Sequence, residues 1–287
     1  MPILTYRGQE AGLLPVNGHA WKDSEQPLEQ RGIEGGFFCQ FFREIDSYRD
    51  RMTRNHELSF SRDDVVDPPD WKPSWRDDLT SRRLVADHIF PWTKSISAPL
   101  YARIPEASRG QPNIYLSYPW DAPLLASGYG VIETMGECLK AGDCIWMDVF
   151  CHDQHRVGSA VPQIEKVVGH VQCLFLPMSE PPWFERCWCI WEVMCALRAN
   201  KEIVFIEYAR KQRDMYRIRK YFLSQFSQVR SISLAEASVA EDKALILRQV
   251  QSIFGSIEAA DTFLLSKMKD KMNEVIGDTR EPWERSK

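Results

Sequence analysis

The chain has 287 residues, of which 44% are hydrophobic and 26% charged, the composition of an ordinary globular protein. Its formal net charge of -4 gives no electrostatic reason to expect nucleic acid or an anionic membrane surface as a partner. No apolar run is long enough to span a bilayer, and residues 1–7 lack the basic-then-apolar order of a signal peptide. We therefore expect a cytoplasmic protein without a membrane partner.

Eight cysteines are present, and several fall in predicted strands or helices, which suits buried thiols in a reducing compartment. The alternative is a zinc site built from Cys151, His152, His155, Cys187 and Cys189. Neither segment has the paired C-x-x-C spacing of a structural zinc site, and the C-x-C pair lies on a predicted helix, where its thiols diverge. The sequence therefore predicts no metal site.

Residues 1–110 form an N-terminal, aromatic-rich arm whose role the sequence leaves open. One helix is predicted over 36–52 from a wide apolar face, and a polar stretch broken by prolines follows over 63–75. A short helix is predicted over 79–88, and Pro91 is expected to stop it. The scattered aromatic side chains predict that the arm packs on something, as a lid, an oligomer contact or a regulatory segment.

From residue 111 to 235 short apolar segments alternate with helical ones. Strands are predicted over 113–118, 144–150, 172–177, 203–206 and, more weakly, 229–234, and helices over 130–141, 163–169, 186–197 and 211–226. This alternation indicates an α/β domain with parallel strands and with helices on both faces. Residues 236–287 add two amphipathic helices, over 239–254 and 256–276, which we expect to pack on that domain.

Polar and aromatic residues gather where these predicted strands end. In an open parallel sheet, ligands bind outside the carboxyl ends of the strands. The first strand ends at Ser117, Tyr118 and Trp120, and the second at Asp148 and Phe150. The helix that begins after the third strand starts at the same edge, so topology alone predicts a site there.

That helix carries the candidate functional residues. At helical spacing Ile190, Met194 and Leu197 share one face, which fits packing against a sheet. Trp188 lies one turn before Glu192 on an adjacent stripe, so the indole would cover the surface beside the carboxylate. The alternative interpretation is a solvated first-turn glutamate with tryptophans that fill the core.

The order of these segments resembles a TIR (Toll/interleukin-1 receptor) domain. Residues 114–118 resemble the apolar strand of the family that leads to Ser-Tyr, and 146–148 resemble its strand that ends in Asp before the long BB loop, here 151–162. Trp188-x-x-x-Glu192-Val193, followed by a short gap and the strand 203–206, is similar to TIR domains that cleave NAD. The resemblance implies a flavodoxin-like three-layer sandwich with a parallel five-stranded sheet.

The resemblance implies an NAD+ glycohydrolase that releases nicotinamide and ADP-ribose or its cyclic form, with NAD+ as substrate and no cofactor. Glu192 would be catalytic, stabilising the developing positive charge or acting as a transient nucleophile, and Trp188 would stack on a ring of the substrate. Ser117 and Tyr118 would hydrogen-bond the ribose or phosphate. The remaining expected substrate-binding residues are the pocket walls Trp120 and Phe150 and the strand-end Asp148, for which capping of the following loop is an equal alternative.

One carboxylate suffices for this chemistry. Cleavage of the nicotinamide–ribose bond passes through an oxocarbenium-like centre, as in glycoside hydrolysis. Nicotinamide leaves as a neutral molecule from a cationic pyridinium, so no second carboxyl group is needed to protonate it.

Other functions stay open at this point. The resemblance also covers non-catalytic signalling modules that associate with their own kind through the 151–162 loop and neighbouring helices, and catalytic members activated by assembly in defence or cell-death signalling. A different nucleotide-binding protein is disfavoured because no G-x-G-x-x-G or G-x-x-x-x-G-K loop follows any strand. A nucleoside-transferring enzyme with a single glutamate stays an alternative.

Overall fold

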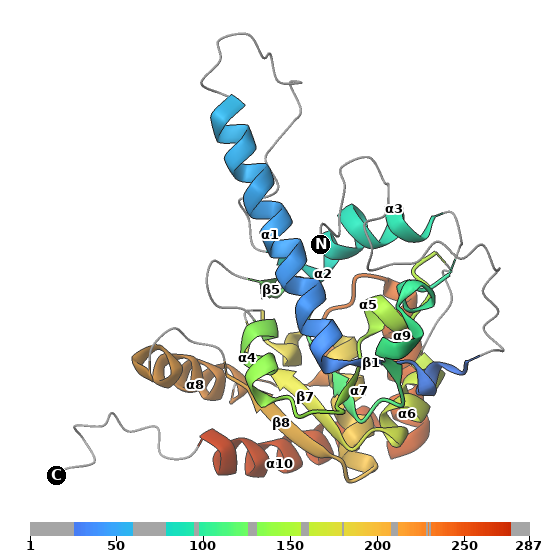
Figure 1. Cartoon of the computed structure of the whole chain (residues 1–287). Coiled ribbons are helices and arrows are strands. Elements are labelled where there is room, and N and C mark those ends of the chain that lie inside the picture. Colours follow the sequence, from blue (N-terminus) through green and yellow to red (C-terminus); the bar gives the residue numbers. More distant parts are fainter. Residues whose placement is uncertain are drawn as a thin grey trace.

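The computed structural model describes residues 26–59, 79–94, 98–125, 131–155, 161–179, 181–207, 212–227, 229 and 231–276 (Figure 1). The strands are Gly32–Glu34 (β1), Leu79–Thr80 (β2), Arg109–Gly110 (β3), Ile114–Leu116 (β4), Pro123–Leu125 (β5), Cys144–Trp146 (β6), Cys173–Pro177 (β7) and Glu202–Ile206 (β8). The α-helices are Gly35–Ser59 (α1), Ser81–Arg83 (α2), Phe90–Thr93 (α3), Val131–Cys138 (α4), Asp148–Cys151 (α5), Val161–His170 (α6), Cys187–Arg198 (α7), Gln212–Phe226 (α8), Ala240–Phe254 (α9) and Ile257–Ile276 (α10). Short 3-10 or π-helical turns are Leu28–Gln30 (η2), Leu84–Ile89 (η4), Leu100–Arg103 (η5), Glu106–Ser108 (η6), Trp183–Glu185 (η7) and Ile232–Leu234 (η8).

The fold is α/β with a mixed six-stranded central sheet in the order β3-β1-β6-β4-β7-β8. Strands β6, β4, β7 and β8 are parallel, whereas β1 pairs antiparallel with both β6 and β3. The chain passes from β4 to β6 on one side and then returns to β7 on the other. The carboxyl end of β4 is therefore the point where the strand order reverses, which is where open α/β sheets form a crevice.

The expected five-stranded parallel sheet differs from this arrangement at both ends. The weak strand predicted over 229–234 is wrong, because Ile232–Leu234 forms the 3-10 turn η8. There the backbone N–H of Ile232 donates to Asp261 of α10 at 2.8 Å, and that of Ser233 donates to the Ser231 hydroxyl. These N–H groups are thus satisfied by side chains instead of a neighbouring strand.

The described part of the N-terminal arm belongs to the sheet and its core. Ile33 of β1 pairs with Ile145 of β6, and Gly32 faces Gly110 of β3. Helix α1 follows at once, and the Glu34 carboxylate accepts the N–H groups of its first turn. The phenylalanines of α1 pack on Phe150 of helix α5. The ring centres of Phe38, Phe41 and Phe42 each lie within 6 Å of the ring centre of Phe150.

Two predicted element boundaries are also corrected. The strand predicted over 144–150 ends at Trp146, because the Asp148 carboxylate accepts the N–H of Val149 and helix α5 begins. The helix expected to end at Pro91 runs on to Thr93. The π-helical turn η4 lies just before Pro91, and in it the Phe90 N–H donates to the Val85 carbonyl, an i→i−5 bond. The hydrogen-bond register thus changes just before Pro91, which has no N–H to donate.

The C-terminal segment is attached to the start of α7. Arg186 and Glu236 form a parallel β-bridge, in which the Cys187 N–H donates to the Glu236 carbonyl at 2.8 Å and the Glu236 N–H to the Glu185 carbonyl at 2.7 Å. Helix α9 begins four residues later and lies beside α7 (Figure 1). The bridge therefore fixes where α9 starts relative to the predicted functional helix.

Within the part of the chain that the structure describes, no helix is both long enough and apolar enough to cross a membrane.

Candidate functional site

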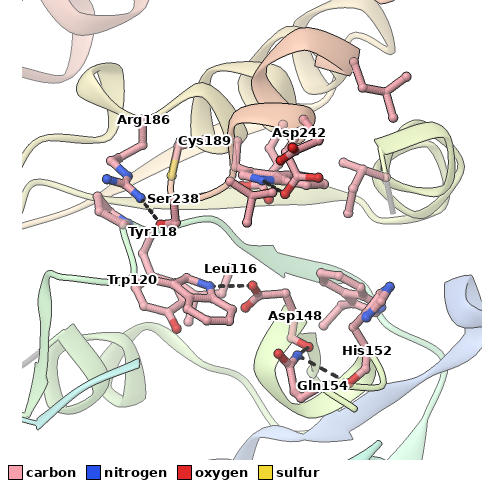
Figure 2. Close-up of a pocket in the computed structure, with 18 of the residues that line it drawn as sticks. Leu116, Tyr118, Trp120, Asp148, His152, Gln154, Arg186, Cys189, Ser238 and Asp242 are labelled. Atoms are coloured by element: carbon pink, nitrogen blue, oxygen red, sulfur yellow. Dashed lines mark hydrogen bonds between the residues drawn. The ribbon is translucent and has the colours of Figure 1, made fainter. Parts of the chain in front are cut away.

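A cavity of about 620 Å³ opens at the carboxyl ends of β4 and β6 (Figure 2). Its walls come from the ends of these strands, from α5 and the residues after it, from the first turns of α7, and from α9 with the residues before it. The lining residues are Leu116, Tyr118, Pro119, Trp120, Trp146, Asp148, His152, Asp153, Gln154, Ile164, Arg186, Trp188, Cys189, Glu192, Ser238, Val239, Glu241, Asp242, Leu245 and Arg248.

Glu192 lies on the inner side of this cavity and is only 7% exposed. Its carboxylate is held at both oxygens: the Tyr115 hydroxyl donates to Oε1 at 2.8 Å, and the Ser117 hydroxyl donates to Oε2 at 2.5 Å. Tyr115 of β4 and Ser117, which directly follows that strand, are two residues apart in extended backbone and so project to the same face of the sheet. The glutamate is therefore a buried, oriented group and not a solvated surface residue.

The burial of Glu192 changes its acidity. The pKa of the Glu192 carboxyl is raised to about 8, chiefly by removal from water and also by the nearby negative charge of Asp148. The hydrogen bonds from Ser117 and Tyr115 act in the opposite direction, because they stabilise the ionised form. The carboxyl group therefore changes its charge near physiological pH, as acid–base and electrostatic catalysts commonly do.

Trp120 and Asp148 meet at one side of the cavity (Figure 2). The Trp120 indole N–H donates to Asp148 Oδ2 at 2.7 Å, while Oδ1 accepts the backbone N–H of Val149. Burial raises the pKa of Asp148, and the bond from Trp120 opposes that rise. Asp148 is thus the first residue of helix α5, where it accepts the N–H of the next residue and holds the Trp120 ring at the cavity wall. Its predicted contact with a substrate stays a prediction.

Trp188 lines the cavity from the first turn of α7, one turn before Glu192. It is partly exposed, and its indole N–H donates to Asp242 Oδ2 of α9 at 3.2 Å. Nearby, Arg186 donates to the Ser238 hydroxyl at 2.7 Å, and its guanidinium lies 3.8 Å from Asp121. The cavity wall formed by α9 is therefore hydrogen-bonded to α7, through Trp188 and Asp242.

The structure brings together five of the seven sequence-predicted site residues on the cavity lining: Tyr118, Trp120, Asp148, Trp188 and Glu192. Ser117 does not line the cavity but reaches it through its bond to Glu192. Phe150 is fully buried among the phenylalanines of α1 and does not line the cavity, so its predicted place in the pocket wall is wrong. In the expected strand, Phe150 would lie on the same face as Asp148. It lies instead in helix α5, where these two side chains point in different directions.

Tyr118 presents a further feature of the lining. Its ring is 4% exposed, and its hydroxyl is buried without a hydrogen-bond partner among the described residues. A buried hydroxyl without a partner is energetically costly.

One partner of Glu192 and several residues of the cavity wall could not be identified from the sequence motifs. Tyr115 carried a signal, since it stands two residues before Ser117 on the same face of a strand, but a strand tyrosine more often packs in a core. Asp242, Leu245 and Arg248 share one face of α9, yet nothing in their spacing indicates that this face closes a site. The β-bridge at Glu236, the bond from Trp188 to Asp242 and the packing of α9 on α7 place them there.

Two remaining predictions concern loops and metals. Residues 156–160 of the 151–162 loop, among them Arg156 as a possible contact for a phosphate, lie outside the described residues. All eight cysteines are free thiols. Among the described residues no group of three or more His, Cys, Asp or Glu side chains is placed to hold a metal ion.

In comparisons with known proteins, no protein-family model, no curated protein and no solved structure matches the chain.

Proposed function

We propose that the protein is an NAD+ glycohydrolase with a TIR-like, flavodoxin-like α/β fold, in which Glu192 is the catalytic residue. The observation that carries the proposal is the Glu192 carboxyl group, which is buried and held by two hydroxyls on the lining of a cavity at the strand-order reversal. The parallel part of the sheet has the order second-first-third-fourth, which fits a flavodoxin-like arrangement.

The residues around the cavity divide the work of this reaction. Trp188 and Trp120 offer flat apolar faces to the nicotinamide ring. The Tyr118 hydroxyl supplies a hydrogen bond to the ribose or phosphate. When the C–N bond breaks, positive charge develops on the ribose, and the ionised Glu192 stabilises it. Nicotinamide departs neutral, so the site needs no acid. For the hydrolysis product, water then adds to the ribose carbon and releases one proton.

The raised pKa of Glu192 fits a cationic substrate. In the free protein at neutral pH the carboxyl group is largely protonated, because its pKa is about 8. A pyridinium cation in the cavity favours the carboxylate, since a nearby opposite charge lowers the pKa of an acid. Binding of NAD+ would therefore release the proton and form the charged group where the reaction uses it.

The test is nicotinamide release from NAD+ by the purified full chain, compared with Glu192→Gln and Glu192→Ala. We expect each variant to lose at least about 100-fold in kcat, the usual scale for removing one electrostatic stabiliser of a transition state. Glu202→Gln, a change of the same kind at an exposed residue of β8, is the matched control and should keep full activity. Turnover by both Glu192 variants at the parent rate would remove Glu192 from the mechanism.

The resemblance also implies activation by assembly, so turnover is to be measured over a series of protein concentrations. Activity per molecule that rises with concentration would support self-association through the 151–162 loop and neighbouring helices. A role in defence or cell-death signalling stays a prediction from the resemblance alone.

A further inference from the structure

Two indole rings of the cavity are each paired with a carboxylate. Trp120 donates its ring N–H to Asp148 at 2.7 Å, and Trp188 donates its ring N–H to Asp242 at 3.2 Å. Figure 2 shows Trp120 and Asp148 together on one side of the cavity and Asp242 on the opposite side. Both indoles are partly exposed, and both line the cavity.

This pairing has an electrostatic consequence. The face of an indole ring attracts cations through its quadrupole. A carboxylate at the ring N–H places a full negative charge at the edge of the same ring, so the two attractions add. A neutral ligand gains only the stacking, while a cationic ligand of the same shape gains both.

The charges of the lining act in the same direction even without Glu192, which is largely protonated in the free protein. Among the described lining residues five carry carboxyl groups and two carry guanidinium groups. One of these two, Arg186, lies within 4.0 Å of carboxylates of Asp121 and Glu236, which are not part of the lining. The acidic groups of the lining are Asp148, Asp153, Glu192, Glu241 and Asp242.

We propose that the cavity is a receptor for cationic, N-substituted pyridinium rings, and that Asp242 of α9 is a specificity-determining residue within it. The inference deepens the proposed function and rests on it for the identity of the ring. It also goes beyond the TIR resemblance, because α9 follows the region that the resemblance covers. The segment after the α/β domain thereby sets which form of the ring the site accepts.

The experiment is equilibrium binding to the full chain of two ligands that differ only in charge, measured by titration calorimetry. 1-Methylnicotinamide carries a permanent positive charge, and nicotinamide is its neutral counterpart. We expect the cation to bind about tenfold more tightly, the scale of a desolvated cation–π contact. Neither ligand needs to be cleaved, so the result does not depend on catalysis.

Asp242→Asn separates the charge from the geometry, because the asparagine carbonyl oxygen can still accept the Trp188 N–H. We expect this variant to lose at least about threefold in affinity for 1-methylnicotinamide and nothing in affinity for nicotinamide. Asp270→Asn, the same change at an exposed residue of α10, is the control and should behave as the parent. Trp188→Phe keeps an aromatic face without the N–H donor and should reduce the preference for the cation.

Equal affinity for the two ligands, an unchanged preference in Asp242→Asn, or no binding of either ligand at millimolar concentration would each overturn the inference. The proposed function fails separately, if Glu192→Gln cleaves NAD+ as fast as the parent. A preference for the cation without any effect of Glu192 on turnover would keep the receptor and discard the enzyme.

Discussion

Glu192 shows how a strand and a helix together set the acidity of one side chain. Burial raises its pKa, and the hydroxyls of Tyr115 in β4 and of Ser117 just after it limit that rise. The glutamate and Ser117 were both identified from the sequence, because helical spacing and the strand end indicate them directly. Tyr115 was missed as a partner, since the pattern of a buried strand does not reveal which side chains reach a helix packed against it.

A first prediction concerns the pH dependence of the reaction. In the parent, kcat/KM for NAD+ should rise with pH and reach half its maximum near pH 8, because the free protein must lose the Glu192 proton. Ser117→Ala removes a hydrogen bond that stabilises the carboxylate, so its half-maximum should move to higher pH. Initial rates over pH 6 to 10 measure both values.

Ser179→Ala is the control for that series. Ser179 is equally buried, but its hydroxyl donates to the Pro181 carbonyl and does not contact Glu192. Its profile should match that of the parent. A Ser117→Ala profile that coincides with the parent profile would show that another group titrates.

At the scale of elements, the strand–helix alternation of residues 113–206 was predictable because each element there has its own apolar pattern. The antiparallel strands β1 and β3 were not, since they have three and two residues and too little pattern to recognise. Their place depends on close contact between two glycines. A Cβ added to Gly32 would meet the Gly110 carbonyl oxygen at 2.6 Å and the Pro112 nitrogen at 2.7 Å.

A second prediction follows from that contact. Gly32→Ala should lower the free energy of unfolding by about 2–3 kcal/mol, because the methyl group would clash with backbone atoms that cannot move away alone. Gly169→Ala is the matched control. A Cβ there meets nothing within 4 Å on helix α6, so that variant should gain up to about 1 kcal/mol. Urea unfolding measures both changes, and a Gly32→Ala midpoint equal to that of the parent would contradict the pairing of β1 with β3.

At the scale of the whole molecule, the buried Glu192 makes stability depend on pH. Its pKa is about 8 in the folded protein and near 4.5 when exposed, so the folded state holds the proton more tightly. The resulting stabilisation is complete below about pH 4.5 and is lost as the pH rises to about 8. The slope approaches about 1.4 kcal/mol per pH unit between these limits, a total on the order of 5 kcal/mol.

A third prediction compares the parent with Glu192→Gln across that range. The amide does not ionise and can keep both hydroxyl contacts, so the variant should lack this loss of stability. The variant should therefore be the more stable protein at pH 9, by a few kcal/mol, and this advantage should shrink toward pH 5. Denaturant unfolding at several pH values checks this, and parallel curves for the two proteins would contradict it.

The parallel bridge between Arg186 and Glu236 has a practical consequence for anyone who expresses a shortened form of the protein. A fragment of residues 111–235, the α/β domain predicted from the alternation of strands and helices, would end one residue before Glu236 and would lack this bridge. It would leave behind the two outer strands at one margin of the sheet and the helix that carries Asp242. Such a fragment would keep Glu192 but lose the wall that α9 forms beside it in the cavity. A lack of activity in the fragment would therefore say nothing about the activity of the intact chain.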